Sequence, residues 1–196
     1  MKKPGLLELR PTQFVLGMKE IEYKTALIAT LSAKELVRYC ETHVIPVVIG
    51  PRNQFFMVDH HHFARACWEM KVEQYQVEVW KDLRTAGHKQ FWNFMIKKEW
   101  TYLRDQFGMG PHSPDALPSD IRCLADDPYR SLAWAVLEKG GFKKVEVPFF
   151  EFQWAAFYRQ NLEITLHSKS DFRDAIKVAT ALSKSKEAKH LPGYRF

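Results

Sequence analysis

Two apolar runs stand close together in the first half of the chain. Residues 44–49 are apolar and rich in β-branched side chains, and residues 54–58 resume an aromatic and β-branched run. Between them, residues 50–53 have the sequence Gly-Pro-Arg-Asn, which is dense in turn-forming residues. This order predicts a strand, a tight turn and a second strand.

The pattern changes to helical spacing after Asp59. Apolar side chains recur at Phe63, Ala66, Cys67 and Met70, as they do along one face of a helix. The pattern therefore predicts a helix that follows the second strand, with Asp59 as its N-cap residue.

Flanking segments supply the other elements of a mixed α/β unit. Ser32 followed by Glu35 has the capping pattern of a helix start, and residues 75–80 alternate with the period of a strand. Residues 6–16 predict a short strand that leads into a loop, and the charged stretch 19–24 predicts a surface helix or an active-site loop. We therefore expect a compact α/β domain over residues 6–82.

The second half is helical and rich in aromatic side chains. Apolar residues recur at helical spacing from residue 85 onward, and further helices are predicted over residues 129–138 and 171–184. The aromatic stretch 149–158 must pack against something, either the first domain or another subunit, so a homodimer is one expectation. The fold class is thus α+β, with a helical, aromatic-rich lobe over residues 83–196.

Composition narrows the classes of partner. The chain has 196 residues, 46% of them hydrophobic, which is enough for a sizeable core. A net charge of +6 and a pI near 9.2 suit a nucleotide or a nucleic acid, although charge alone decides no reaction. The three cysteines form no CxxC pair, which favours a reducing cytoplasm. No apolar run is long enough to predict a membrane span.

Candidate chemistry concentrates in three consecutive histidines, His60, His61 and His62, beside the carboxylate of Asp59. At a helix start they would lie near main-chain N–H groups that attract an anion, and histidine exchanges protons near neutral pH. Consecutive helical residues point about 100° apart, so at most two of the rings can share one pocket. A phosphate or nucleotide contact is the leading interpretation, with a metal site and a purely structural role as alternatives.

Four features of residues 6–82 occur in the same order as in a known superfamily. They are Pro11-Thr12-Gln13 after the first strand, the helix from Ser32, the strand over residues 44–48, and the strand that ends at Asp59 and the histidines. In these features the chain resembles the ParB/sulfiredoxin superfamily, and within it the ParB-like nucleases.

That resemblance implies a phosphate site at the histidines. Asp59, His61 and His62 match the first, third and fourth residues of the superfamily's Asp-Gly-His-His-Arg box, with other residues in place of its glycine and arginine. Arg65 matches a later arginine of the related Gly-Glu-Arg-Arg form. Because the superfamily includes CTP-dependent DNA clamps, sulfinic acid reductases that use ATP and kinases of free serine, it implies phosphate handling more firmly than one activity.

The leading hypothesis is a phosphodiester hydrolase or phosphotransferase that binds a phosphate or nucleotide at this box. The residues assigned to catalysis are Asp59, His61, His62 and Glu22. The residues assigned to phosphate binding are His60, His61, His62, Arg65 and Lys24. Gln13 and Glu20 complete the expected pocket, and Glu20 or Glu22 is a candidate ligand for Mg²⁺ bound with a nucleotide.

Two alternative functions stay open on the same sequence. The first is a non-catalytic nucleotide- or DNA-binding module, in which the basic pair Lys97-Lys98 and the basic C-terminal tail matter more than the histidines. The second is a kinase of a small molecule, such as an amino acid, built on the same fold.

Overall fold

The computed structural model describes residues 3–164 and 168–196, which divide into two compact units. The first unit comprises the chain as far as Leu16 together with Ile21–Ala125. The second comprises Gly17–Glu20 and Asp126–Phe196. The first unit therefore continues well beyond residue 82, where the sequence pattern placed a boundary.

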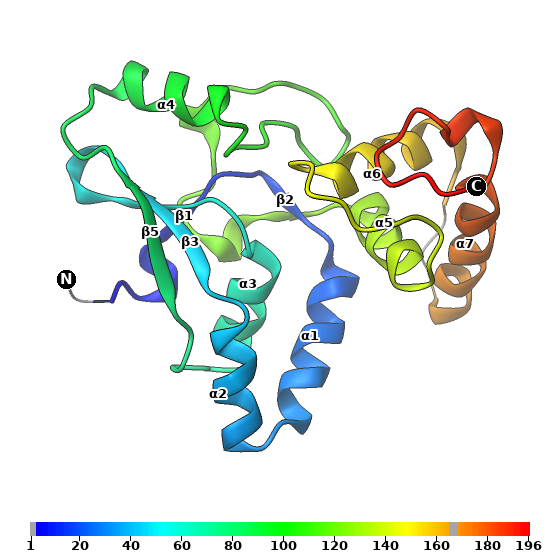
Figure 1. The fold of residues 1–196 in the computed structure, drawn as a ribbon, viewed down its shortest axis with the longest axis horizontal. Coiled ribbons are helices and arrows are strands. Elements are labelled where there is room, and N and C mark those ends of the chain that lie inside the picture. The colour runs from blue at the N-terminus through cyan, green and yellow to red at the C-terminus, as the bar shows by residue number, and fades with distance from the viewer. Residues whose placement is uncertain (1–2, 165–167) are drawn as a thin grey trace. The chain divides into compact units, whose positions relative to one another are not determined.

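A four-stranded mixed sheet forms the centre of the first unit (Figure 1). Its strand order is β1-β4-β3-β5, in which β1 runs parallel to β4, β4 antiparallel to β3, and β3 parallel to β5. The strands are β1 Leu9–Pro11, β3 Ile45–Ile49, β4 Phe55–Met57 and β5 Val77–Asp82. The predicted hairpin of two strands and a tight turn is thus confirmed, and the whole chain has the expected α+β class.

Helix α4 covers one face of this sheet. Arg10, Phe56 and Val48 are paired across β1, β4 and β3, so their side chains share a face. Rings from α4 (His88–Lys97) pack there, with the centroids of Phe56 and Phe91 4.6 Å apart. The helical periodicity beyond residue 85 therefore builds the core of the first unit, which explains why the unit does not end at residue 82.

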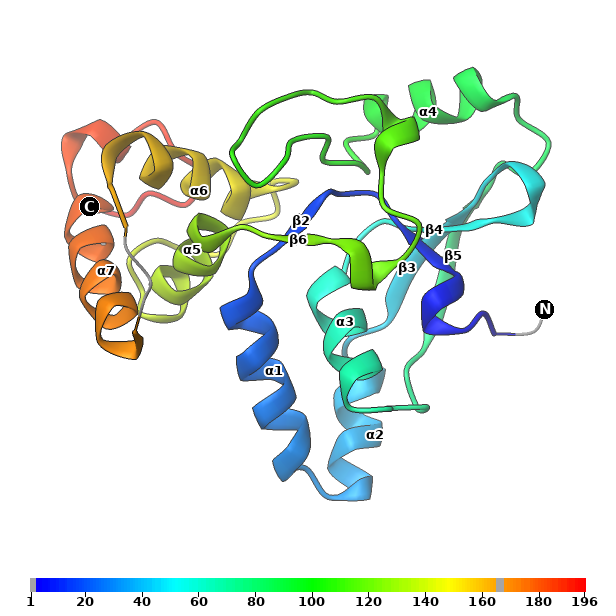
Figure 2. The same cartoon turned by 180° about the vertical axis from the view of Figure 1, so that it is seen from behind.

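Helices α2 and α3 lie on the side of the sheet away from α4 (Figures 1 and 2). Helix α2 (Ala33–Glu41) begins with the predicted capping box, in which Ser32 and Glu35 bond each other's main-chain N–H groups. Helix α3 (His61–Glu69) buries its Phe63 and Cys67 side. The charged stretch near residue 20 lies in α1 (Met18–Thr30), so it is helical.

Short elements complete the first unit. A two-stranded sheet joins β2 (Val15–Leu16) with β6 (Ala125–Asp126), and the Ala125 N–H donates to the Phe14 carbonyl at 3.0 Å. Single turns of 3-10 helix occur along the chain of this unit. They are η1 (Leu6–Glu8), η2 (Pro51–Asn53), η3 (Pro114–Ala116) and η4 (Ile121–Cys123).

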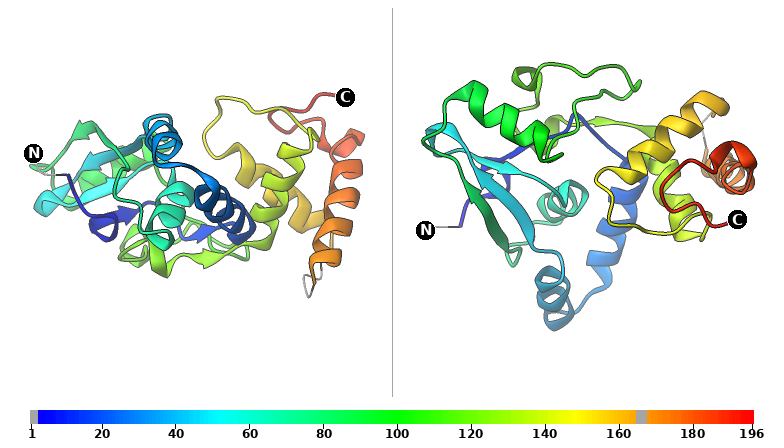
Figure 3. Two further views of the ribbon diagram at one scale, coloured as in Figure 1. Left: turned by 90° about the horizontal axis from the view of Figure 1, so that it is seen from below. Right: turned by 45° about the horizontal axis from the view of Figure 1, so that its top comes forward.

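Three helices form the second unit: α5 (Pro128–Glu138), α6 (Phe150–Asn161) and α7 (Lys169–Leu182), followed by the short turn η5 (Lys186–Ala188). Figure 3 shows the three helices gathered against one another. The buried side chains of Phe142 and Trp154 are stacked with their centroids 4.2 Å apart, and Tyr158 is fully buried beside them. The aromatic stretch of α6 therefore packs largely into a core of its own unit. Within the described residues, no helix is long and apolar enough to cross a membrane.

Candidate functional site at the start of helix α3

Residues 59–62, here called the histidine turn, connect β4 to α3. The N-cap of α3 is His60, which has the left-handed angles φ 64° and ψ 27° and makes no side-chain cap. Asp59 was expected to be the N-cap, but its Oδ1 accepts instead from the adjacent His60 N–H at 2.6 Å. The left-handed residue turns the chain after Asp59, so the carboxylate cannot reach the first turn of the helix as a cap would. The helix start therefore has no side-chain cap from its N-cap residue.

His61 is sealed beneath the turn, with 2% of its side chain exposed. Its Nε2 accepts from the Thr12 N–H at 3.2 Å, and Thr12 Oγ1 donates to the Met57 carbonyl at 2.7 Å. Nε2 acts as an acceptor, so the neutral ring carries its proton at Nδ1. Burial lowers the pKa of His61 to about 3, with Asp59 and a hydrogen bond to the Met57 main chain opposing that shift. His61 is thus a neutral link between the ends of β1 and β4.

The other members of the turn differ in their access to solvent. Asp59 is exposed and His60 is half-buried, whereas 8% of His62 is exposed. The His60 ring lies 5.8 Å from the ring of His43, and among the described residues its buried Nδ1 has no hydrogen-bond partner. Asp59 and His60 are therefore the two groups of the turn that a ligand can approach.

Arg65 is engaged within the protein. Its Nε donates to Glu69 Oε1 at 2.8 Å, and its Nη1 donates to the Ile121 carbonyl at 3.1 Å. Its side chain is 15% exposed. The guanidinium expected to clamp a phosphate instead joins α3 to η4, a contact that sequence spacing could not indicate because Ile121 lies far along the chain.

The remaining site candidates of the first unit differ in burial and in their distance from α3. Gln13 is 4% exposed and donates from Nε2 to the Val15 carbonyl at 2.7 Å, directly after the Thr12 that bonds His61. Lys24 lies near α3: burial raises the pKa of Cys67, and the charge of Lys24 offsets part of that rise. Glu22 is exposed on α1.

Glu20 belongs to a buried ion cluster of the second unit. Its Oε2 lies 3.1 Å from Nη2 of Arg130, which also pairs with Glu151. Burial by itself would lower the pKa of Arg130, but Glu151, Glu20 and Asp127 together raise it above its ordinary value. Glu20 is therefore already neutralised by a buried guanidinium, which is a structural use of a residue that the sequence suggested for the pocket.

The comparison with known families decides the class of protein. A model of the family described as "Putative ParB-like nuclease" matches residues 4–160, which is most of the chain. The chain belongs to this ParB-like nuclease family. The match extends beyond residue 82, so the family likeness includes α4 and reaches into the helical second unit.

One solved structure is similar to the chain over nearly its whole length. The crystal structure of protein Atu1540 from Agrobacterium tumefaciens is similar with a TM-score of 0.88 and 36% sequence identity. The likeness covers 97% of this chain and 93% of that one. No curated protein matches the chain.

Within the described parts of this ParB-like chain, no group of three or more His, Cys, Asp or Glu side chains is placed to hold a metal ion. At the histidine turn the rings make different contacts: His61 bonds the Thr12 N–H, whereas the His60 ring lies near the ring of His43. The three cysteines are free, with Cys40 and Cys67 buried and Cys123 exposed.

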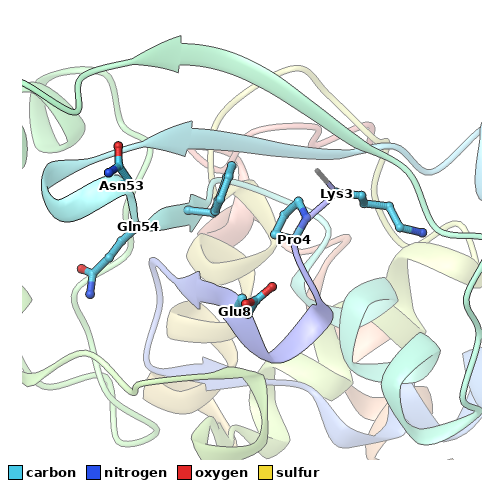
Figure 4. A pocket seen from close by; sticks show the side chains of 6 residues that line it. Lys3, Pro4, Glu8, Asn53 and Gln54 are labelled. Atoms are coloured by element: carbon cyan, nitrogen blue, oxygen red, sulfur yellow. The ribbon is translucent and has the colours of Figure 1, made fainter. Parts of the chain in front are cut away.

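Two cavities in the first unit were not indicated by the sequence patterns. One, of about 360 Å³, is lined by Lys3, Pro4, Glu8, Asn53, Gln54 and Phe55 (Figure 4). The other, of about 340 Å³, lies beside α4 and is here called the α4 cavity. Arg10, Arg52, Gln54, His88 and Asp115 are its polar lining, and Trp92 is part of its apolar wall. The sequence predicts the Gly-Pro-Arg-Asn turn, but nothing local indicates that Arg52 and Arg10 line the same cavity.

Proposed function

We propose that the histidine turn binds the phosphate of a nucleotide or nucleic acid, and that the protein acts there as a phosphodiester hydrolase or phosphotransferase. The observation that carries this proposal is the start of α3, which has no side-chain cap and lies beside the accessible Asp59 and His60. Main-chain N–H groups and the helix dipole at such a position favour an anion. Membership of the ParB-like nuclease family supports phosphodiester chemistry in particular.

Each residue of the turn has a distinct part in this proposal. His60 is the candidate for proton exchange, because its ring is half-buried beside the exposed carboxylate of Asp59. Asp59 holds the main chain of His60 through the 2.6 Å bond and orients the turn toward the ligand. His61 is a positioning residue: it fixes the turn through Thr12 and stays neutral at the pH of the reaction.

Mg²⁺ enters the proposal only as a companion of the nucleotide phosphates. Magnesium commonly keeps several waters and binds through one or two carboxylates plus substrate phosphates. Asp59 is an exposed carboxylate beside the helix start, which fits such a partial ligand set. The ion would neutralise phosphate charge, while the main-chain N–H groups of α3 hold the phosphate in place.

The test is an assay of phosphodiester cleavage with single- and double-stranded DNA, in the presence of Mg²⁺. We expect Asp59→Asn and His60→Gln each to lower the cleavage rate about tenfold or more, because the first removes the orienting carboxylate and the second removes the ring that exchanges a proton. The matched control is His190→Gln, because His190 is an exposed histidine of the second unit. If both turn variants cleave DNA as fast as the control, the catalytic proposal is wrong.

A second candidate function, binding without catalysis, has one observation in its favour. The most enclosed imidazole of the turn, His61, has a pKa of about 3 and makes hydrogen bonds to its own protein, so it cannot serve as a proton donor near neutral pH. Under this alternative the wild type binds DNA or nucleotide but releases no product. Fluorescence anisotropy of labelled DNA measures binding by the same three variants, and this binding should fall steeply with added salt. The cleavage assay then shows whether the bound DNA is also cleaved, which separates catalysis from binding alone.

A further inference from the structure

We propose that the α4 cavity is a second ligand site, which takes a nucleoside carrying a phosphate monoester, either as a free nucleotide or as the 5′ end of a strand. The cavity lies on the α4 face of the sheet, among residues of β1, η2, α4 and η3. Its volume of about 340 Å³ falls in the range of about 300–1,000 Å³ that is usual for small-molecule pockets. This inference is independent of the histidine turn.

The charge of the cavity indicates an anionic ligand. Two guanidinium groups, those of Arg10 and Arg52, line one small space, and neither makes a hydrogen bond or ion pair with any residue that the structure describes. Arg65, Arg84 and Arg122 show the contrast, since each is paired with a carboxylate at 2.9 Å or less. Two like charges side by side repel each other, and a phosphate bridging them relieves that repulsion and accepts from both forks.

The main chain holds Arg52 in an unusual conformation at the rim. Arg52 has φ 61° and the following Asn53 has φ 58°, so two successive non-glycine residues are left-handed. The turn is closed by the Gly50 N–H, which donates to the Gln54 carbonyl at 2.8 Å. Successive left-handed residues are usual in tight hairpin turns, where asparagine and glycine are the common residue types, so an arginine at the first of the two positions is the unusual feature. Arg10 belongs to β1, and its pairing with Phe56 of β4 fixes the position of its main chain at the cavity.

An apolar wall completes the cavity on the side of α4. Phe56, Phe91 and Trp92 meet edge to face or tilted, with centroids 4.6 to 5.3 Å apart. Pro51 and Pro114 add rigid apolar surface at the rim. These rings are largely buried, so they form an apolar floor against which a base can lie, whereas inorganic phosphate would use the arginines alone.

His88 and Asp115 supply a hydrogen-bonding group that a nucleoside can use. Nε2 of His88 lies 3.2 Å from Nε1 of Trp92 and 2.9 Å from Oδ1 of Asp115. One nitrogen serves one of these at a time: without a proton Nε2 accepts from Trp92 Nε1, and with a proton it donates to Asp115 Oδ1. When His88 bonds Trp92, the carboxylate of Asp115 is left to accept from a ribose hydroxyl or a base amine, which neither phosphate nor a simple carboxylic acid provides.

In the other cavity, of about 360 Å³, the charged side chains already have hydrogen-bond partners within the protein (Figure 4). Its ammonium group, on Lys3, donates to the Glu73 carbonyl at 2.6 Å and to the Tyr75 carbonyl at 3.2 Å. Its carboxylate, on Glu8, accepts from the Gly5 N–H at 2.6 Å. Its charged groups therefore have partners within the protein, and size alone does not make it the better candidate.

The test is isothermal titration of the full chain with a nucleoside monophosphate, with a 5′-phosphorylated dinucleotide, and with the same dinucleotide lacking the 5′ phosphate. We expect Arg10→Gln and Arg52→Gln each to weaken binding of the phosphorylated probes about tenfold or more, since a charged hydrogen bond is lost. Leu117→Trp, which leaves the charge unchanged, should weaken binding by filling the cavity. The charge-matched control is Arg84→Gln, which lies outside the cavity and should bind like the wild type.

The outcomes separate the sources of the ligand and the two sites. Preference for the monophosphate or for the phosphorylated dinucleotide identifies a free nucleotide or a strand end, and either supports the proposal. Equal binding of the probe without a 5′ phosphate, unchanged affinity in the Arg10→Gln, Arg52→Gln double variant, or an equal loss in Arg84→Gln overturns it. Binding that is lost in Arg10→Gln and Arg52→Gln reports on the α4 cavity, whereas DNA cleavage that is lost in Asp59→Asn and His60→Gln reports on the histidine turn, so failure at one site is distinguishable from failure at the other.

Discussion

The histidine turn and the α4 cavity use their charged and polar side chains in opposite ways. At the turn and in the helix that follows it, His61 and Arg65 are bonded to main-chain groups of Thr12 and Ile121, and they hold the fold together. In the cavity, Arg10 and Arg52 have no such partners among the described residues. A residue type that is typical of active sites does not by itself identify a ligand site. The hydrogen-bonding groups of that residue must also be without partners inside the protein.

The same difference gives the two regions different energetic roles. Removing a group that satisfies a buried partner leaves that partner unpaired, which costs stability. Removing a charge that has no partner costs the fold little and costs ligand binding much. The following predictions test that division, from the largest expected effect on stability to the smallest.

Replacing His61 by alanine should give the largest loss. The change removes a buried ring and leaves the Thr12 N–H without its 3.2 Å acceptor, so we expect the free energy of unfolding to fall by about 3 kcal/mol. Urea unfolding followed by circular dichroism measures it. His60→Ala is the matched control and should cost less than about 1 kcal/mol because its ring is half-buried. Equal losses in the two variants would contradict a structural role confined to His61.

Acid should destabilise the protein through the same residue. The pKa of His61 is about 3 in the folded protein, below its ordinary value of 6.5, so the unfolded chain binds the proton more readily. Stability from this group is complete above pH 6.5 and is lost as the pH falls toward 3. Between pH 7 and pH 5 the loss should be about 2 kcal/mol. His61→Gln keeps an acceptor but does not titrate, so its urea midpoint should change less over that interval. A pH dependence identical to that of the wild type would show that His61 is not the group responsible.

Arg65→Gln should have a smaller effect, because the residue is partly solvated. It loses the ion pair to Glu69 and the bond to the Ile121 carbonyl, and we expect a cost of about 1 kcal/mol. Thermal unfolding is a suitable measurement. An unchanged midpoint would show that the contact between α3 and η4 is not used for stability, and would make this arginine available again as a phosphate ligand.

The smallest effect on stability is expected for the arginines of the α4 cavity. Arg10→Gln and Arg52→Gln break no ion pair of the described structure, so each should change the free energy of unfolding by less than about 0.5 kcal/mol. The same thermal unfolding experiment, run beside Arg65→Gln, compares three arginines with one substitution. A large loss in either cavity variant would show that the cavity arginine is structural, and the contrast between the two regions would disappear.

Much of the fold could be predicted from the local sequence. The Gly-Pro-Arg-Asn turn between two apolar runs, the capping box at Ser32 and the helical spacing after residue 85 all depend on neighbours within a few positions, and each element formed as expected. The N-cap of α3 was misassigned because the left-handed angles of His60 moved the helix start by one residue beyond Asp59. The boundary of the first unit was not predictable, since α4 belongs to it through contacts with Phe56.

The sequence by itself determined the strands, the turns, the amphipathic helices and the resemblance to the ParB-like nucleases, because those depend on residue type and short spacing. Only the tertiary structure decided that His61 faces Thr12, that Arg65 reaches Ile121, and that Arg10 and Arg52 line the same cavity. The physical reason is that hydrogen bonds and burial are set by residues brought together from distant parts of the chain. The residue type sets the chemistry of a side chain, but the groups that folding places beside it decide whether that side chain stabilises the fold or remains available to a ligand.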